Sequence, residues 1–212
     1  RGAEFSVAPG MALRSYKITD DDEAGTTNSL LVKDAVEHIL RYNAQSGADK
    51  VNIINISYGL DSDNAELREV FKKAYDSGVT IIASAGNGAN ARLVYPAAYD
   101  FVISVGAATK NGQIYPSSSY GKIDFMAPGE DIFTIDGNNG YIALEGGTSY
   151  AAAYITGLAA LITEAYLAKT GRRPTPAEVY GTLAKISLKM PNVQAQRQGH
   201  GMPDASKITG VI

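Results

Sequence analysis

Apolar residues recur along the chain with two different periods, and these periods predict alternating strands and helices. Runs rich in β-branched residues predict buried strands at Val51–Ser57, Val79–Ser84 and Phe101–Ala107. Apolar positions spaced three and four residues apart predict an amphipathic helix over Ser29–Gln45. A second helix is predicted over Asn64–Ser77, with Asn64 as its N-cap and Gly78 as its stop. Strands that alternate with helices at this spacing predict an α/β fold, with a doubly wound, mostly parallel sheet flanked by helices.

The remaining segments add further predicted elements. The half-alternating run Leu13–Ile18 predicts another strand, and short strands are expected around Ile123–Ala127. A helix that is apolar nearly all round is expected from Ser149 to about Lys169, so it should be buried. The stretch Thr175–Glu178 has the pattern of a capping box with proline at the first helical position, which predicts that a helix begins there.

Composition and charge narrow the class of protein. With 212 residues, 45% of them hydrophobic and 19% charged, the chain has the composition of a soluble globular protein, and residues 1–212 are expected to form one domain. The net charge of −3 argues against a nucleic-acid partner. The apolar run Tyr150–Ile162 is shorter than a membrane span requires, so no membrane span is expected. The absence of cysteine excludes disulfides, thiolate metal sites and a cysteine nucleophile.

Two features were considered for metal binding and acid–base chemistry. The acidic run Asp20–Glu23 could bind calcium, because carboxylate oxygens suit a hard cation. A solvated acidic turn is the preferred interpretation, since the run lacks the ligand spacing of a dedicated calcium loop. His38 falls on the polar side of the helix predicted over residues 29–45, which is typical of a surface histidine. No metal ligand is assigned on this basis.

A glycine-rich turn precedes the apolar helix and carries the strongest candidate for catalysis. Gly146 and Gly147 permit a sharp turn and a close neighbour. Ser149 is thereby placed in the first turn of the helix, where unpaired backbone N–H groups and the helix dipole favour a developing negative charge. The alternative is that Thr148 or Ser149 serves only as the N-cap of the helix.

The sequence around this serine resembles a known catalytic motif. The string Gly147–Ala151, followed by Gly157, resembles the G-T-S-x-A nucleophile motif of the subtilisin-like serine proteases, although Ala153 stands where the family usually has proline. Six further segments resemble family motifs in the same order: Val7–Pro9, Asn55–Gly59, Ala83–Asn87, Tyr95–Ala97 with Val105–Ala107, Phe125–Gly129, and Gly199–Gly201 with Asp204. The resemblance runs through almost the whole chain and implies a subtilisin-like fold.

The resemblance also implies roles for the matching residues. Ser149 would be the nucleophile that attacks a peptide carbonyl, and the side-chain amide of Asn87 would bind the oxyanion together with the Ser149 backbone N–H. An extended polypeptide substrate would pair with two backbone segments: Ser57, Tyr58, Gly59, and Ser84, Ala85, Gly86. No cofactor would be required for the chemistry, although structural calcium is common in the family. For Asn87 the alternative is a turn residue, present because asparagine tolerates the left-handed region.

The aspartate and histidine that activate such a serine have no match in the chain. In the family both precede the segment that matches Val7–Pro9, so they are expected upstream of Arg1, and the domain is expected to be incomplete at its N-terminus. His38 and His200 do not match the family's base. Three explanations stay open: an autoprocessed enzyme whose Asp and His lie on a separate N-terminal fragment, a truncated form, or a non-catalytic pseudoprotease scaffold that binds a peptide or protein partner.

The leading interpretation is a serine endopeptidase of subtilisin type, with this chain inactive by itself. Its expected partners are a polypeptide substrate, the N-terminal fragment and a propeptide, and a secreted or cell-surface bacterial location is the family's commonest case. A different α/β hydrolase fits less well, because Gly-x-Ser-x-Gly requires a second glycine where Ala151 stands. Without its partner segment the chain is expected to be weakly stable, since part of the sheet would be missing and apolar surface exposed.

Overall fold

The predicted α/β architecture is confirmed by the computed structural model, which describes the chain except residues 1–5, 20–26, 48, 91 and 136–139 and the side chains of residues 143–145. In the described residues, four parallel strands form the central sheet in the order β1-β2-β3-β4. These strands are β1 (Ile53–Ile56), β2 (Thr80–Ser84), β3 (Ile103–Ala108) and β4 (Phe125–Pro128).

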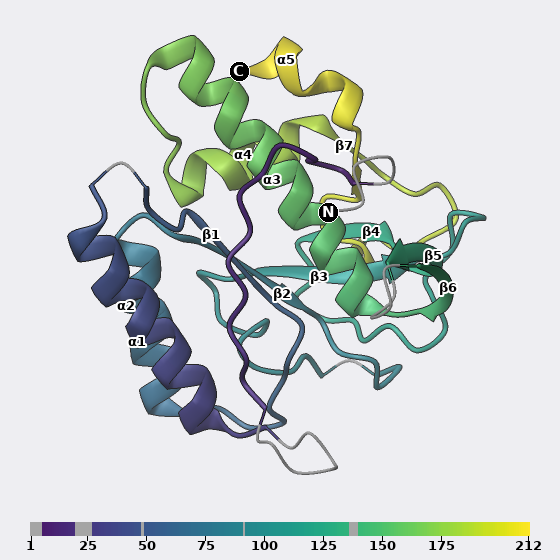
Figure 1. The fold of residues 1–212 in the computed structure, drawn as a ribbon. Coiled ribbons are helices and arrows are strands. Elements are labelled where there is room, and N and C mark those ends of the chain that lie inside the picture. The colour runs from purple at the N-terminus through teal and green to yellow at the C-terminus, as the bar shows by residue number, and fades with distance from the viewer. Residues whose placement is uncertain (1–5, 20–26, 48, 91, 136–139) are drawn as a thin grey trace.

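Helices cover both faces of this sheet (Figure 1). One face carries α1 (Ser29–Gln45) and α2 (Ala65–Asp76), and the other carries α3 (Thr148–Thr170), α4 (Pro176–Ile186) and α5 (Ile208–Val211). Strand β2 contributes to both cores, because Ile81 and Ala83 pack with the α1–α2 cluster whereas Ile82 packs with the α3 cluster. This two-sided burial explains why the strand is a continuous apolar run instead of an alternating one.

Helix α3 is the centre of the second core. It contacts all four strands of the sheet, and its buried residues include Ile155, Leu158 and Ile162. At 23 residues and a mean hydropathy of 1.4, it is the one described helix long and apolar enough to cross a membrane by length and composition alone. A core helix passes the same test, and the contacts of α3 with the sheet are those of a core helix.

Shorter elements complete the structure. Strands β5 (Glu130–Ile135) and β6 (Tyr141–Gly146) form an antiparallel hairpin that leads directly into α3. Strands β7 (Ser187–Leu188) and β8 (Met202–Pro203) form a second antiparallel pair. Two 3₁₀ turns occupy Ala195–Arg197 and Ala205–Lys207.

The predicted strand at Leu13–Ile18 is wrong. This segment has no strand assignment, and the nearest bridge joins Thr19 to Thr27. Tyr16 and Ile18 nevertheless pack against the α1–α2 core, while Leu13 is 75% exposed. The apolar pattern therefore reports partial burial correctly, but a strand also requires a neighbour with which to form hydrogen bonds, and no described segment pairs with this one.

The predicted capping box at the start of α4 is confirmed. Thr175 Oγ1 accepts a hydrogen bond from the Glu178 backbone N–H at 3.2 Å, and the Glu178 carboxylate accepts one from the Thr175 backbone N–H at 2.8 Å. Arg172 adds a bidentate pair to the same carboxylate, at 2.8 and 2.6 Å. The Arg172 guanidinium, followed by the Thr175 N–H, holds the pKa of Glu178 well below its ordinary value.

This lowered pKa predicts how stability depends on pH. A carboxyl group with a depressed folded-state pKa stabilises the fold above its unfolded-state pKa, and this contribution is lost as the pH falls. Glu178→Gln should therefore lower the melting temperature at pH 7, and the difference from wild type should shrink between about pH 5 and pH 3. Melting curves recorded across this range test the expectation.

The matched control is Glu164→Gln, because Glu164 forms no ion pair within the described part of the chain. Its melting temperature should follow that of the wild type at every pH. If the difference in melting temperature between Glu178→Gln and wild type stays constant down to pH 3, the carboxylate does not stabilise the fold through its charge.

Candidate active site

The turn before Ser149 is shaped by two glycines with positive φ. Gly146 has φ +137°, and a Cβ atom built there would lie 2.0 Å from the Gly129 carbonyl oxygen. Gly147 has φ +143°, acts as the N-cap of α3 and donates its N–H to the same carbonyl at 2.7 Å. The alternative, in which Thr148 or Ser149 is only the N-cap, is not supported, because the capping residue is Gly147 and it makes no side-chain cap hydrogen bond. Ser149 lies in the first turn of α3, as predicted.

Asn87 is held beside this turn by the residue before the serine. The carbonyl oxygen of its side chain, Oδ1, accepts hydrogen bonds from both the backbone N–H and the hydroxyl of Thr148, each at 3.0 Å. With Oδ1 engaged in this way, the amide plane is fixed and Nδ2 is left as the donor on the other side. A Cβ atom at Gly147 would lie 3.3 Å from Nδ2, so a larger residue would crowd the amide. The arrangement presents an N–H donor next to the start of α3.

The left-handed alternative for Asn87 is not supported. The positive φ angles in this loop belong to Gly86, at +100°, and Ala89, at +51°, and not to Asn87. Thr148, which the sequence analysis treated only as a candidate cap, is instead the residue that orients Asn87. It also receives the Gly86 N–H on its hydroxyl at 3.2 Å. The only sequence signal for this role of Thr148 was its position between Gly147 and Ser149 in the motif.

The two predicted substrate-binding segments lie at the carboxyl ends of β1 and β2; the first follows β1, and the second begins with Ser84, the last residue of β2. Ser57 is exposed, and its hydroxyl donates to the Ser149 carbonyl oxygen at 3.2 Å, which joins the first segment to the nucleophile turn. Burial raises the pKa of the Tyr58 phenol. A Cβ atom at Gly59 would lie 2.2 Å from the Val94 side chain, so the chain passes close to Val94 at this point.

The second segment is more enclosed. Ser84 and Ala85 are buried, and Ala85 donates its N–H to Val105 of β3 at 3.0 Å. The Gly86 carbonyl accepts the Ser119 N–H at 2.9 Å. The structure therefore brings this segment to the same place as Asn87 and Ser149, with its backbone fixed by neighbouring strands and loops.

Neither histidine lies at this site. His38 is exposed on α1, with Nδ1 3.2 Å from the Tyr16 hydroxyl. His200 stacks on Phe125 and lies 3.1 Å from the Tyr180 hydroxyl. Within the described residues, no histidine, aspartate or glutamate side chain forms a hydrogen bond with Ser149. The site therefore contains a serine and an oriented amide donor, and the described chain supplies no general base beside them.

Metal binding receives no support from the described residues. They contain no group of three or more His, Asp or Glu side chains that could hold a metal ion. The acidic run Asp20–Glu23, where calcium was considered, lies outside the described residues. Calcium therefore stays a prediction.

The Subtilase family profile matches residues 4–209 of the chain. The chain belongs to the subtilase family. Among curated subtilases, subtilisin DY of Bacillus licheniformis is 34% identical over 167 residues, which make up 76% of this chain and 57% of that protein. The major intracellular serine protease of Bacillus subtilis (strain 168) is 37% identical over 147 residues, 66% of this chain and 46% of that protein.

Solved structures agree with this assignment. The self-cleaved protease domain of PatA superposes with a TM-score of 0.76 at 26% identity, covering 91% of this chain and 71% of that chain. The prenylagaramide maturation protease PagA superposes with a TM-score of 0.77 at the same identity, covering 91% of this chain and 70% of that chain. The chain thus has the subtilisin-like fold but spans only about half the length of the curated subtilases it matches.

The cellular location stays a prediction. Related subtilases include one named an extracellular protease and one named an intracellular protease, both of Bacillus subtilis. Family membership therefore indicates bacterial relatives on both sides of the membrane and does not single out the secreted location that the sequence analysis expected.

Proposed function

We propose that this chain supplies the nucleophile and the oxyanion hole of a subtilisin-type serine endopeptidase. The observation that carries the proposal is the orientation of the Asn87 amide by Thr148 beside Ser149. An N–H donor fixed in advance stabilises the oxyanion of a tetrahedral intermediate without reorganisation during the reaction. The Ser149 backbone N–H, in the first turn of α3, is the second donor, and the helix dipole acts in the same direction.

The substrate of this site is an extended polypeptide. Ser57, Tyr58 and Gly59 follow β1, which lies at the edge of the described sheet, and Ser84, Ala85 and Gly86 stand at the end of the neighbouring strand β2. Backbone pairing along such an edge holds a peptide independently of its side chains. Attack by Ser149 Oγ on the scissile carbonyl forms the acyl-enzyme, and water then releases the acyl group.

The general base and its carboxylate partner come from a polypeptide segment other than the described residues. Among the described residues, strand β1 has a neighbour on one side only, β2, and the apolar segment Leu13–Ile18 has no strand partner. A strand added beside β1 would complete this edge and bring its following loop toward Ser149. Autoprocessing would account for a separate N-terminal fragment. The description of PatA as self-cleaved motivates this step for the present chain. A propeptide and structural calcium remain further proposals.

A non-catalytic scaffold is the second candidate function. It is favoured by the absence, among the described residues, of an acid or base hydrogen-bonded to Ser149. In that case the site would bind a peptide without cleaving it.

Proteolysis by the natural assembly tests the first proposal. The protein is purified with every polypeptide that accompanies this chain, and digestion of casein is compared with that by a Ser149→Ala assembly. We expect the substitution to remove cleavage, because it removes the hydroxyl that forms the acyl-enzyme. Ser77→Ala, at the far end of α2, should cleave normally. Equal cleavage by wild type and Ser149→Ala would refute the assignment, and peptide binding without cleavage in either form would favour the scaffold.

A further inference from the structure

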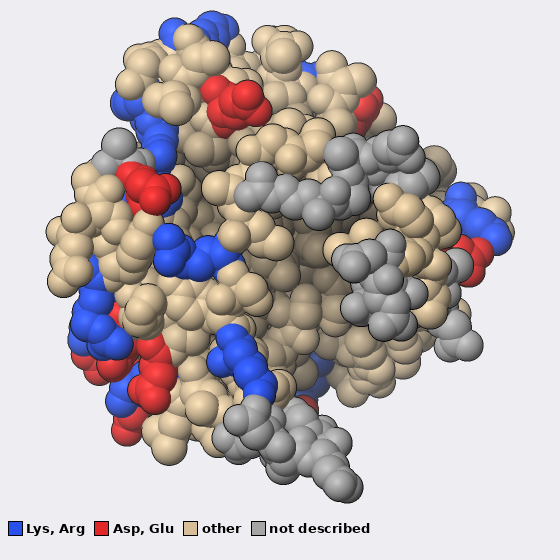
Figure 2. Space-filling model, viewed as in Figure 1, with Lys and Arg blue, Asp and Glu red and all other residues tan. Residues whose placement is uncertain are grey.

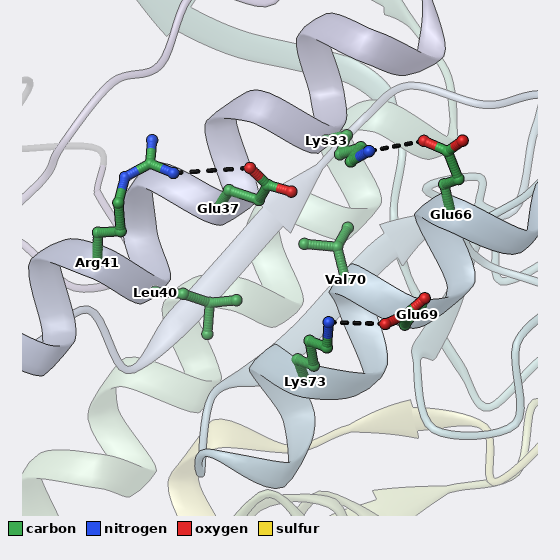
Figure 3. A pocket seen from close by; sticks show the side chains of 8 residues that line it. All are labelled: Lys33, Glu37, Leu40, Arg41, Glu66, Glu69, Val70 and Lys73. Carbon is green, nitrogen blue, oxygen red and sulfur yellow. Dashed lines mark hydrogen bonds and ion pairs between the residues drawn. The ribbon is translucent and has the colours of Figure 1, made fainter.

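Two cavities of about 370 Å³ lie away from Ser149, and they differ in whether their charges are paired. The first lies between α1 and α2, where charged side chains of both signs are mixed on the surface (Figure 2). Figure 3 shows that its three cations each meet a carboxylate: Lys33 with Glu66 at 2.6 Å, Arg41 with Glu37 at 3.6 Å, and Lys73 with Glu69 at 2.7 Å. Because each cation of this lining is already paired with a carboxylate of the same lining, the cavity gives no reason to expect a charged ligand.

The second cavity has a different lining. It lies between the segment that follows β3 and the loop before β8, and it is lined by Gln113, Ile114, Tyr115, Pro116, Asn192, Val193, Gln194 and Arg197. None of these residues is acidic. The two segments that form the walls also lack acids over a longer stretch, since residues 101–123 and 179–203 contain neither aspartate nor glutamate. In a chain of net charge −3, this is a locally cationic region.

Arg197 is the only charged residue of this lining, and no carboxylate of the described residues pairs with it. Its guanidinium carbon lies 4.0 Å from the centroid of the Tyr120 ring, a cation–π contact that holds the group against the ring. Its Nε is buried and has no hydrogen-bond partner. Within the described residues Arg197 forms no ion pair. An arginine that lines a cavity and forms no ion pair among the described residues is suited to bidentate recognition of a carboxylate.

The walls of the cavity are held in place by other contacts. The side chain of Gln198 is 2% exposed and bridges its loop, because it accepts from Met190 N–H at 2.7 Å and donates to the Met190 and Val193 carbonyls at 3.1 and 2.6 Å. On the other side, the Tyr115 N–H donates to the Ala107 carbonyl of β3 at 2.8 Å. The cavity is therefore formed without a ligand, which reduces the entropy lost on binding.

We propose that this cavity is a binding site for the carboxylate of a peptide, with Arg197 as the group that pairs with it. The amide side chains of Gln113, Asn192 and Gln194 both donate and accept hydrogen bonds, so they suit the backbone that flanks such a carboxylate. The volume of about 370 Å³ is in the range of known ligand sites. The carboxylate could come from a free C-terminus or from an acidic side chain, and the two sources share this chemistry.

The test measures binding of four short peptides by NMR, with the Ser149→Ala protein so that cleavage cannot interfere. The first pair is acetyl-Gly-Ala-Gly with a free carboxyl terminus and the same peptide amidated. The second pair is the amidated peptides acetyl-Gly-Glu-Gly and acetyl-Gly-Gln-Gly. We expect at least one carboxylate peptide to shift the signals of Arg197 Nε–H and Tyr120, and its neutral counterpart to bind about tenfold more weakly or not at all. Which pair shows the difference identifies the source of the carboxylate.

Arg197→Gln should lower the affinity for the carboxylate peptide by about tenfold or more, because it removes the positive charge and the guanidinium donors. Arg14→Gln is the matched control, since Arg14 also lies over a tyrosine ring, 3.9 Å from the centroid of Tyr42, but does not line either cavity. Equal binding of the acid and neutral peptides would overturn the proposal. This comparison is made with Arg197 intact, so it remains valid if the Arg197→Gln protein fails to fold. Full binding by a folded Arg197→Gln protein would overturn it as well. None of these outcomes depends on whether the assembly cleaves peptides.

Discussion

Asn87→Ala should lower kcat of the active assembly by about 10²–10³-fold, with a much smaller change in KM. The amide of Asn87 is fixed by two hydrogen bonds from Thr148, so its Nδ2 donor is in place before the oxyanion develops. Removing a donor that acts on the transition state lowers kcat more than substrate affinity. The magnitude is that established for a subtilisin, a member of this family, and is carried over here. Initial rates on a chromogenic peptide measure it.

The control for this substitution lies in the same loop. Asn90 is exposed, and its side chain accepts the Arg92 N–H at 2.9 Å instead of contacting the nucleophile turn. Asn90→Ala should leave kcat within about twofold of wild type. A normal kcat in Asn87→Ala would mean that the amide is not the oxyanion donor, however well it is oriented.

Gly146→Ala should destabilise the protein by about 3 kcal/mol or more, through the nucleophile turn. The added Cβ would lie 2.0 Å from the Gly129 carbonyl oxygen, and the φ of +137° is unfavourable for any residue with a side chain. Relief would require the backbone of β5 or of the turn to move, which would break the hydrogen bond from Gly147 N–H to the same carbonyl. Urea unfolding monitored by circular dichroism measures the free energy of unfolding.

Gly181→Ala is the control for this second prediction. Gly181 lies inside α4, and a Cβ atom there would meet no atom within 4 Å. Alanine is the better helix former, so this variant should be more stable than wild type by about 0.5–1 kcal/mol. Equal stability of Gly146→Ala and wild type would show that the turn can relax without cost, and the close approach to Gly129 would then not explain the glycine.

The fold was predictable wherever local pattern and burial agree. Helix α1 runs over Ser29–Gln45, the predicted bounds, because one stripe of apolar residues faces the core and Asn28 caps the start. The capping box of α4 follows directly from the sequence Thr175–Glu178. The strand predicted at Leu13–Ile18 failed for a reason that no local pattern contains, since a strand is defined by a partner and the described chain provides none there.

The sequence predicted which residues form the candidate site better than it predicted the hydrogen bonds between them. The motif around Ser149 and the resemblance at Asn87 identified two residues that are 62 positions apart in sequence, and the fold brings their segments together through Thr148. The role of Thr148 was not predicted, because a hydroxyl next to a helix start more often caps the helix than donates a hydrogen bond to an amide side chain far away in sequence. Arg197 carried no motif at all, and only the folded chain shows that it lines a cavity without an ion-pair partner among the described residues.

The most direct test of the central claim is the site of covalent labelling by a fluorophosphonate probe. The natural assembly is treated with the probe, every polypeptide in it is sequenced, and the modified residue is mapped by tandem mass spectrometry. The account predicts a single adduct on Ser149 and an accompanying segment that carries an aspartate and a histidine, because an unactivated serine hydroxyl reacts too slowly with such probes. An assembly that contains such a segment but leaves Ser149 unlabelled, or carries the adduct on another residue, would contradict it.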